Sequence, residues 1–327
     1  MFAVIMNETG GPEVLTYGEI ATPEPGPGEV RVRVAYAGVN PADWKNRQGM
    51  LAAFRPYVFP YVLGFDAAGV VDAVGEGVTE FAVGERVFTP TNHGQGAQGS
   101  YAEYVLAGVD RVALVPDGLG FAEAAALPVA ALTAWQALQH NGGVRPGQRV
   151  LVHGGSGGLG GFAVQFARAA GARVAATCST PNVPYVADLG VERVIDYATE
   201  DVTAAIKEWA PDGLDLLVNT AGASALAHGL DLVRSGGTFV SIPTLVDDGD
   251  IPAEMAAAAE RGVERGYSMM TDVDSGPTLA TIARLVLSGE VRLPEIRTFD
   301  LRDAAAAHAA IQTGHTRGKI VLRVAEL

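Results

Sequence analysis

Hydrophobic and polar positions alternate with a period of two in the first third of the chain. The clearest segment is 29–36, EVRVRVAY, where apolar and charged residues follow one another. Such alternation is typical of half-buried strands, and segments 67–74 and 85–89 have the same character. Glycines separate these segments and mark turns or bulges. Residues 1–122 are therefore predicted to form a compact, mostly antiparallel β-barrel.

From about residue 123 the pattern changes to short apolar runs that alternate with helical segments. The predicted strands are residues 150–152, 173–177, 193–196, 214–219 and 238–242. The predicted helices are residues 121–138, interrupted at Pro128, and residues 160–170, 185–189, 202–209 and 224–233. This alternation predicts an α/β domain with a doubly wound parallel sheet, which binds ligands at the carboxyl ends of its strands. Residues 123–265 are assigned to this domain.

The last segment, residues 266–327, contains a predicted helix at 278–287 and a predicted strand at 319–324. The strand is short and Arg323 interrupts its apolar residues, unlike the longer apolar runs of a buried parallel sheet. We therefore expect this strand to return to the first domain and to pair there.

The segment 149–172, RVLVHGGSGGLGGFAVQFARAAGA, places a glycine-rich loop between a strand and a helix. Gly155, Gly157 and Gly160 match G-x-G-x-x-G, in which glycines permit a tight turn, close approach of a pyrophosphate and close helix packing. The first N–H groups of the helix and its positive dipole end would face the phosphates. The predicted nucleotide contacts in this loop are Gly155, Ser156, Gly157, Gly158, Leu159 and Gly160.

The same loop permits two other interpretations. It can be a tight turn that holds no ligand. It also matches G-x-S-x-G around Ser156, the nucleophile elbow of an α/β-hydrolase, with Asp215 and either His308 or His315 following in the required order. Residues 93–96 could then serve as the oxyanion loop. Too few sheet strands precede the loop for a hydrolase, and the first third is barrel-like, so a nucleotide site is favoured.

Composition narrows the class of protein. With 327 residues, 48% of them hydrophobic and 18% charged, the chain is long enough for two globular domains. The net charge of −14 argues against binding to nucleic acid or to an anionic membrane. No segment reads as a signal peptide or a membrane span, so a cytoplasmic protein is expected. Cys178 is the single cysteine, which excludes an intramolecular disulfide and a cysteine-based metal cage.

The segment after the second predicted strand of the α/β domain bears on the choice of nucleotide. NAD sites usually place an acidic residue there, against the ribose hydroxyls. The segment 177–182, TCSTPN, contains no Asp or Glu. Ser179 and Asn182 could instead donate hydrogen bonds to a 2′-phosphate, which predicts NADPH as the cofactor. A polar turn that contacts no ligand is the alternative.

Several longer motifs occur along the whole chain. They are GGPEVL, GVNPADWKNRQG (38–49), LGFDAAGVVDAVGEGV (63–78), GERVF, GSYAEYV, LPVAALTAWQAL, VLVHGGSGGLGGFAVQFA and GHTRGKIVL. Together they resemble the medium-chain dehydrogenase/reductase superfamily, in its zinc-free quinone oxidoreductase (zeta-crystallin-like) branch. The resemblance implies a GroES-like β-barrel catalytic domain built from both ends of the chain, a Rossmann domain between them, an active-site cleft between the two domains, and a homodimer.

The resemblance also bears on metal content and substrate. Where zinc-binding relatives have Gly-His-Glu, this chain has Gly64, Phe65 and Asp66, and neither the ligand cysteine nor the four-cysteine cluster is present. Both zinc ions are therefore expected to be absent. Reduction of a simple ketone without a Lewis acid leaves an unsupported alkoxide, whereas a quinone or enone yields a delocalised anion. We expect an NADPH-dependent reductase of quinones, enones or related conjugated carbonyl or enoyl substrates. A nucleotide-binding protein with little turnover, as among crystallin relatives, is a further possibility.

The resemblance assigns two residues to catalysis. Asn40, in GVNPAD, matches a position near the nicotinamide ribose and the substrate, although Asn before proline also favours an Asx turn. Lys45 matches a position that is lysine in a related group of alkenal and enone reductases. A lysine there could donate a hydrogen bond or a proton to the developing enolate. A solvated surface lysine is the alternative.

Other cofactor contacts follow from the resemblance and from the sheet rule. Thr133 matches a position close to the nicotinamide, and Tyr197 matches one that reaches the 2′-phosphate. Asn182 stands where many relatives have Lys, which removes one cation from that subsite. Segments 219–221 and 241–243 end two predicted parallel strands, so contacts are expected from Asn219, Ala221 and Ile242. Residues 267–270 fall where the substrate pocket of the family varies.

Overall fold

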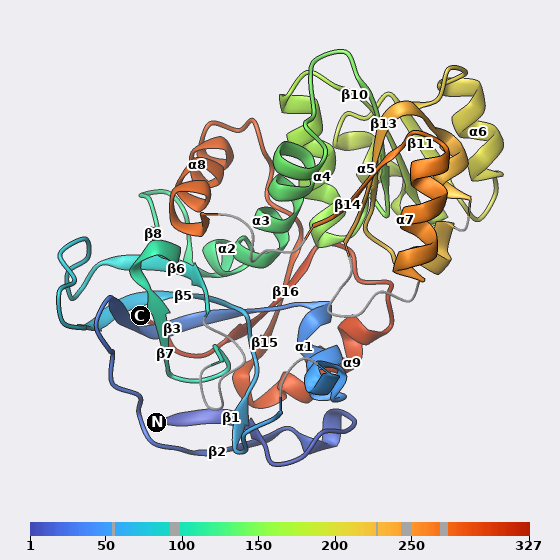
Figure 1. The fold of residues 1–327 in the computed structure, drawn as a ribbon. Helices are drawn as coiled ribbons and strands as arrows, with labels where there is room; N and C mark the ends of the chain where they lie inside the picture. The colour runs from blue at the N-terminus through green and yellow to red at the C-terminus, as the bar shows by residue number, and fades with distance from the viewer. Residues whose placement is uncertain (54–55, 92–98, 227, 243–249, 269–273) are drawn as a thin grey trace. The chain divides into compact units, whose positions relative to one another are not determined.

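A computed structural model describes residues 1–53, 56–91, 99–226, 228–242, 250–268 and 274–327 (Figure 1). The chain forms two compact units. The first contains Met1–Leu132, Val273–Gly289 and Leu293–Leu327, and the second contains Thr133–Asp272 and Glu290–Arg292. Domain boundaries near residues 122 and 265 stay predictions. None of the helices described here is both long and apolar enough to cross a bilayer.

The first unit is built mainly from β-strands. Its larger sheet has the order β15–β16–β3–β5–β6–β8, with β7 also paired to β3, and a smaller sheet has the order β2–β1–β4. The strands are β1 (Phe2–Met6), β2 (Thr16–Glu19), β3 (Glu29–Val39), β4 (Tyr61–Val62), β5 (Asp66–Val74), β6 (Arg86–Pro90), β7 (Tyr104–Gly108), β8 (Ala113–Leu114), β15 (Ile296–Asp300) and β16 (Lys319–Arg323). Apart from the parallel pair β15 and β16, the described pairs are antiparallel.

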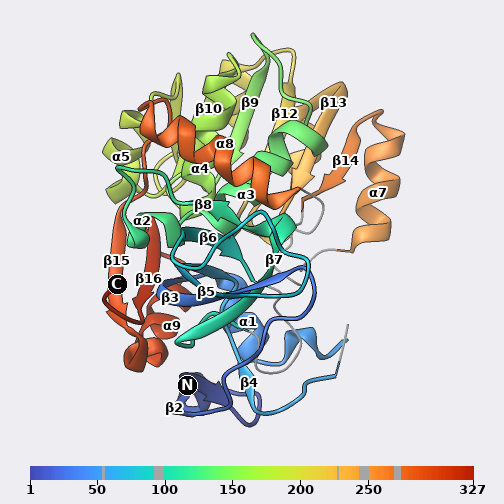
Figure 2. The ribbon, with the colours of Figure 1, turned by 90° about the vertical axis from the view of Figure 1, so that its left-hand side faces the viewer.

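The last strand returns to the first unit, as predicted. In β16, Ile320 pairs with Val39 of β3, so the two ends of the sequence share one sheet (Figure 2). The helices of this unit are α1 (Pro41–Arg47), α2 (Phe121–Ala125), α8 (Ser275–Leu287) and α9 (Ala304–Gln312). The predicted break at Pro128 is also present, because α3 (Pro128–Gln136) begins there, where proline lacks only an N–H that a helix start does not use.

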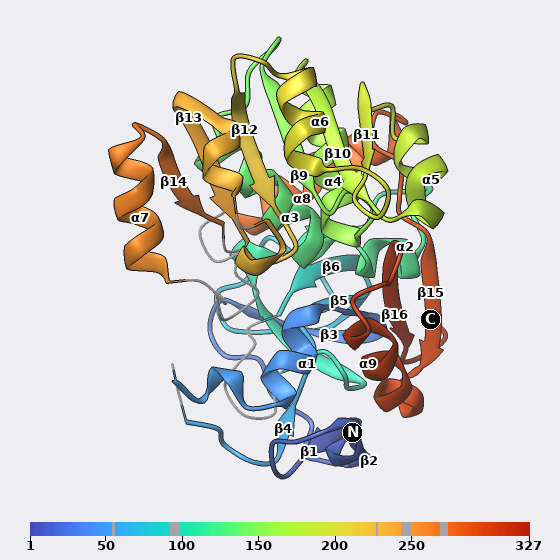
Figure 3. The same cartoon turned by 90° about the vertical axis from the view of Figure 1, so that its right-hand side faces the viewer.

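The second unit has one parallel sheet with the strand order β11–β10–β9–β12–β13–β14 (Figure 3). Its strands are β9 (Arg149–His153), β10 (Arg173–Cys178), β11 (Arg193–Asp196), β12 (Leu214–Asn219), β13 (Val233–Ser241) and β14 (Glu264–Tyr267). Its helices are α4 (Gly158–Ala169), α5 (Val183–Asp188), α6 (Val202–Trp209) and α7 (Ile251–Glu260). The central strands are buried almost without interruption, as expected when both faces of a parallel sheet are covered.

One predicted helix is wrong. The described residues between 223 and 232 include two short 3-10 turns, Ala223–Leu226 and Gly229–Leu232, and β13 already begins at Val233. Gly229 explains part of the difference, because glycine is a poor helix former and a Cβ there would come 2.9 Å from the Phe239 ring. The strand β14 and the helix α7 at the sheet edge were not predicted.

Candidate functional site

Two glycines of the loop after β9 are required by packing inside the protein. A Cβ on Gly155 would stand 2.8 Å from the Cβ of Ala176 in β10. A Cβ on Gly160 would stand 2.1 Å from the carbonyl oxygen of Gly154. Gly154 itself has φ +87°, a left-handed conformation that favours glycine. The turn and its contact with α4 therefore depend on small residues at these three positions.

Gly157 differs from its neighbours, because packing does not require a glycine there. A Cβ at this position would lie 3.6 Å from the carbonyl oxygen of Gly154, the nearest atom in the described parts of the chain. Its φ of −71° and ψ of 163° suit any residue. Gly157 is the N-cap of α4, so it borders the N–H groups of the first helical turn, which have no partners within the helix. The space that a side chain would fill fits the close approach of a phosphate group.

The end of β10 holds this turn in place. The Thr177 hydroxyl accepts a hydrogen bond from the N–H of Gly154 at 3.0 Å, and the Thr177 carbonyl accepts one from Gly155 at 2.9 Å. The same hydroxyl lies 2.8 Å from Nδ1 of His153. Burial lowers the pKa of His153 to about 4, so the imidazole is neutral at pH 7. The sequence alone does not indicate a role for Thr177 or His153, because their contact depends on the pairing of β9 with β10.

The predicted ribose subsite lies at the ends of β10 and β11. Ser179 and Asn182 are half-buried, and the Asn182 amide donates to the Ser179 hydroxyl oxygen at 3.1 Å. Tyr197 is 49% exposed. The pairing of β10 with β11 places Asp196 opposite Cys178. This carboxylate at the predicted subsite was not expected from the sequence. A hydrogen bond from the Thr180 hydroxyl lowers the pKa of Asp196, which also accepts the N–H of Ala198 at 3.0 Å.

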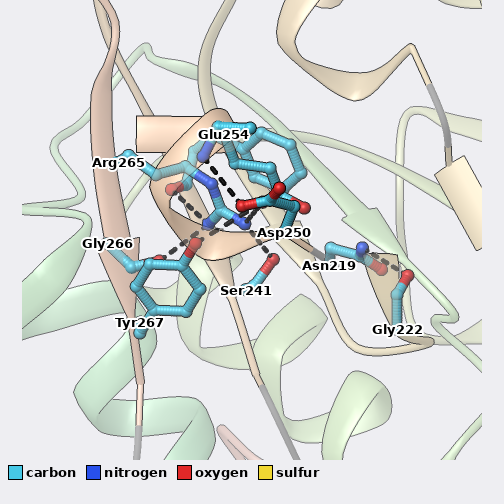
Figure 4. A network of polar contacts seen from close by, with 10 residues as sticks. Asn219, Gly222, Ser241, Asp250, Glu254, Arg265, Gly266 and Tyr267 are labelled. Carbon is cyan, nitrogen blue, oxygen red and sulfur yellow. Dashed lines mark hydrogen bonds and ion pairs between the residues drawn. The ribbon is translucent and has the colours of Figure 1, made fainter. Parts of the chain in front are cut away.

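At the end of β12, Asn219 closes a tight turn (Figure 4). Its amide donates to the Gly222 carbonyl at 2.7 Å, and its Oδ1 accepts the N–H of Ala221 at 3.1 Å. The N–H of Ile242 donates to the Asn219 carbonyl at 3.1 Å, so the ends of β12 and β13 are joined. Asn219 is buried and shapes this edge through its side chain, whereas Ala221 is exposed.

Thr133 is buried within α3, and its carbonyl accepts the Ser268 hydroxyl at 3.1 Å. The predicted pocket segment 267–270 is described only for Tyr267 and Ser268, since residues 269 and 270 lie outside the described residues. Residues 93–96 and Pro243 also lie outside them.

Arg265, in the edge strand β14, forms a buried polar cluster that the sequence analysis did not anticipate (Figure 4). Its guanidinium lies 4.3 Å from the centre of the Phe239 ring and 4.4 Å from that of Tyr267. It donates to the Ser241 hydroxyl oxygen at 2.8 Å and forms an ion pair with Glu254 of α7. The cluster therefore holds Ser241, the last residue of β13, in a fixed position.

In the first unit, Asn40 follows the last residue of β3 and is buried among charged partners. Its Nδ2 donates to Oδ2 of Asp66 at 2.8 Å, and its Oδ1 accepts from Nζ of Lys319 at 2.6 Å. The other carboxyl oxygen of Asp66 accepts the N–H of Val129 at 2.8 Å. Burial raises the pKa of Asp66, and Lys319 opposes that shift. The carboxamide of Asn40 thus binds Asp66 and Lys319, a role beyond the Asx turn considered from the sequence.

The helix α1, which follows Asn40, carries Asp43 and Lys45. Asp43 accepts the N–H of Asn40 at 2.8 Å and that of Gly64 at 3.0 Å. Burial raises the pKa of Asp43 from 3.8 to about 7, against the effect of the hydrogen bond from Asn40. Lys45 is half-buried, with Nζ 5.8 Å from the centre of the Trp44 ring. Its predicted role as a donor stays a prediction.

The hydrolase interpretation lacks its triad. Ser156 follows the carboxyl end of β9, whereas Asp215 lies at the start of β12, where it accepts the N–H of Arg149 at 2.7 Å. Because β9 and β12 are parallel neighbours, Asp215 and Ser156 are at opposite ends of the sheet. The ring nitrogens of His308 lie 3.2 Å from Arg47 and 3.1 Å from the Tyr101 hydroxyl. Within the part of the chain that is described, no three His, Cys, Asp or Glu side chains converge as a metal site requires.

Comparison with known proteins assigns the chain to a family. Residues 26–117 match the family described as "Alcohol dehydrogenase GroES-like domain", and residues 189–322 match the one described as "Zinc-binding dehydrogenase". The chain is 32% identical to a chloroplast envelope quinone oxidoreductase homolog of Arabidopsis thaliana, over 96% of this chain and 95% of that protein. It is also 32% identical to a 2-haloacrylate reductase of Burkholderia sp, over 98% of each chain.

Among solved structures, the quinone oxidoreductase of Escherichia coli complexed with NADPH has a TM-score of 0.87 and 26% identity, over 99% of this chain and all of the other. The family matches and these relatives therefore indicate an oxidoreductase with a nicotinamide cofactor. The chain belongs to the medium-chain dehydrogenase/reductase superfamily, in its quinone oxidoreductase branch. The α/β fold with a GroES-like domain and a Rossmann-like parallel sheet agrees with the sequence-based prediction.

Proposed function

We propose that this protein is an NADPH-dependent reductase that transfers hydride to quinones, enones or related conjugated carbonyl or enoyl compounds without zinc. The observation that carries the proposal is the open position at Gly157. Among the residues that the structure describes, a Cβ there would meet no atom closer than 3.6 Å, although both flanking glycines of the motif are required by packing. A glycine that the fold does not need is explained by a ligand that approaches its backbone.

Residues of the second unit would contact successive parts of the nucleotide at the carboxyl ends of neighbouring strands. Gly158 and Leu159 would offer N–H groups to the pyrophosphate, which would pass close to Gly157, with Gly155, Ser156 and Gly160 shaping the loop. Ser179, Asn182 and Tyr197 would contact the adenosine ribose and its 2′-phosphate. The nicotinamide would be contacted by Asn219, Ala221 and Ile242, at the ends of β12 and β13, and by Thr133 of α3. When bound, NADPH supplies the hydride that reduces the acceptor.

The choice of NADPH over NADH rests on donors at the end of β10. Because Asn182 donates to the Ser179 oxygen, the Ser179 hydroxyl hydrogen can be donated to a phosphate. Asp196 is the observation in favour of NADH, since a carboxylate at this edge repels a 2′-phosphate. Its hydrogen bonds from Thr180 and Ala198 offset part of that charge. We therefore keep NADPH as the proposal and NADH as the second candidate.

The substrate class follows from the donors that the first unit supplies. Where metal-dependent relatives have Gly-His-Glu, this chain has Gly64, Phe65 and Asp66. Asp66 contacts Asn40 and Lys319. The groups proposed to support a charged oxygen are the Asn40 amide and the Lys45 ammonium. An oxyanion whose charge is delocalised, as in a reduced quinone or enone, needs less stabilisation than a simple alkoxide. A neutral donor or a single charged donor can therefore be enough for it. A homodimer and a cytoplasmic location are also part of the proposal.

Two titrations test the proposal. NADPH fluorescence is followed while protein is added, and then its loss is followed when a quinone, an enone or a matched saturated ketone is supplied. We expect enhancement on binding, rapid oxidation with the conjugated acceptors and slow oxidation with the saturated ketone. Elemental analysis of the active protein should find no stoichiometric zinc, and a chelator should leave the rate unchanged. Binding without turnover would instead favour a nucleotide-binding protein, and zinc-restored activity would contradict the ligand count.

A further inference from the structure

Lys319 is buried in a chain that uses few lysines. The sequence contains three, Lys45, Lys207 and Lys319. Lys207 is exposed on α6, whereas the side chain of Lys319 is only 5% exposed. A buried ammonium is costly unless its hydrogen bonds and its charge are satisfied. Lys319 therefore requires partners that accept its hydrogen bonds and balance its charge, and it does not serve as a surface charge.

The ammonium of Lys319 has three acceptors around it. Nζ donates to Oδ1 of Asn40 at 2.6 Å and to the Val39 carbonyl at 3.3 Å, and it lies 3.5 Å from Oδ2 of Asp66. Three acceptors match the three hydrogens of an ammonium, which is a compact donor without the planar fork of arginine. The same Asp66 oxygen accepts from Nδ2 of Asn40. Asn40, Asp66 and Lys319 therefore form a closed triangle of polar contacts.

The order of strands brings this triangle together. In the larger sheet β3 lies between β16 and β5, with Ile320 opposite Val39 and Asp66 opposite Gly38. Lys319 begins β16, Asp66 begins β5 and Asn40 directly follows β3. These three residues therefore meet at one end of the sheet. A Cβ on Gly38 would come 2.6 Å from Oδ2 of Asp66, so this glycine leaves room for the carboxylate.

The two charged partners determine the orientation of the Asn40 carboxamide. An ammonium can only donate, so Oδ1 must face Lys319, and Nδ2 must then face the carboxylate. One hydrogen of Nδ2 is used by Asp66, and the other has no partner among the residues that the structure describes. Donation from a cation to Oδ1 also polarises the amide, which makes the remaining N–H a stronger donor.

We propose that Lys319 and Asp66 are positioning residues, which orient and polarise the Asn40 carboxamide so that its remaining N–H donates to the substrate oxygen that gains charge. The inference rests on the proposed function, in which Asn40 serves the substrate. It adds two residues that do not touch the substrate themselves. Their effect should therefore appear in kcat and should vanish when the Asn40 carboxamide is removed.

The test is a double-mutant cycle with kinetic and binding measurements. Lys319→Met keeps the alkyl stem and removes the donors. The pair Lys319→Met/Asp66→Asn removes both charges together, so that no unpaired charge stays buried if the single variant folds poorly. Asn40→Ala removes the carboxamide, and Lys207→Met is the matched control at an exposed lysine. For each protein, kcat and KM for an enone, NADPH affinity by fluorescence, and the thermal unfolding midpoint without cofactor are measured.

We expect Lys319→Met and the charge-free pair to lower kcat by about tenfold or more, with KM and NADPH affinity within about twofold of the parent. In the Asn40→Ala background, Lys319→Met should lower kcat by no more than about twofold. An equal loss with and without the Asn40 carboxamide, or a change in the unfolding midpoint with kcat unaltered, would overturn the inference. Failure of the proposed function is distinguishable, because it would appear in the parent protein as an absence of turnover.

Discussion

Gly160 lies so close to Gly154 that a Cβ on Gly160 would stand 2.1 Å from the Gly154 carbonyl oxygen. Real Cβ atoms do not approach an oxygen this closely, so the helix α4 and the turn before it would have to separate. A Cβ on Gly157 would lie 3.6 Å from the same oxygen, an ordinary contact. Within one loop, therefore, packing requires a glycine at position 160 and does not require one at position 157.

This difference predicts opposite outcomes for two substitutions in the loop. Gly157→Val should keep the thermal unfolding midpoint close to that of the parent. It should weaken NADPH binding by about a hundredfold or more, since two or more N–H contacts to phosphate are lost. Gly160→Ala should destabilise the protein by about 1–3 kcal/mol through overpacking. Fluorescence titration and thermal unfolding of both variants test this, and normal NADPH affinity in Gly157→Val would refute the assigned loop.

Cofactor preference can be shifted in both directions at the ends of β10 and β11. Ser179→Asp places a carboxylate against a 2′-phosphate, so it should weaken NADPH binding by about tenfold or more and leave NADH nearly unchanged. Asp196→Asn removes an existing carboxylate from this edge and should strengthen NADPH binding relative to NADH. Dissociation constants for both nucleotides are compared in the parent and in each variant. Equal affinity of the parent for the two nucleotides would contradict the NADPH proposal.

Lys45→Met tests the donor proposed on α1. The variant keeps the stem of the side chain and removes the ammonium. Turnover of enones should fall by about a hundredfold, the scale of removing one oxyanion donor. Quinones should lose less, because their developing charge needs less support, and NADPH affinity should change little. Lys207→Met serves as the control, and parent-like rates for both substrate classes in Lys45→Met would assign the donor role to Asn40, a ribose hydroxyl or water.

The raised pKa of Asp43 predicts that the stability of the protein depends on pH. Burial raises its pKa from 3.8 to about 7, so the folded protein holds this proton more tightly than the unfolded chain does. The contribution of Asp43 to stability is therefore complete below pH 3.8 and is lost as pH rises through about 7. Relative to Asp43→Asn, the free energy of unfolding of the parent should fall across this window and then level off. Denaturant titrations at a series of pH values measure it, with Asp117→Asn as an exposed control. A constant difference between parent and variant would contradict the prediction.

The sequence by itself determined the class of fold, and it predicts where a nucleotide loop would lie. Alternation with a period of two identified β3, β5 and β6, and the apolar runs identified β9 to β12. These signals are local, because side-chain direction repeats along a strand and turn chemistry depends on neighbouring residues. The glycine motif could be recognised because it, too, depends on residues that are neighbours in sequence. The motifs that carry the family resemblance span the whole chain, and the comparisons agree with them.

Only the tertiary structure decided which side chains meet. Asn40 and Lys319 are 279 residues apart in sequence and form a hydrogen bond because β3 and β16 are neighbours. Asp196 reaches the end of β10 through the pairing of two strands. Residues 224–233 have a helical pattern, yet the described residues there form short 3-10 turns and the start of β13 at Val233. Strand order and register arise from packing across the whole domain, and no local pattern of residues encodes them.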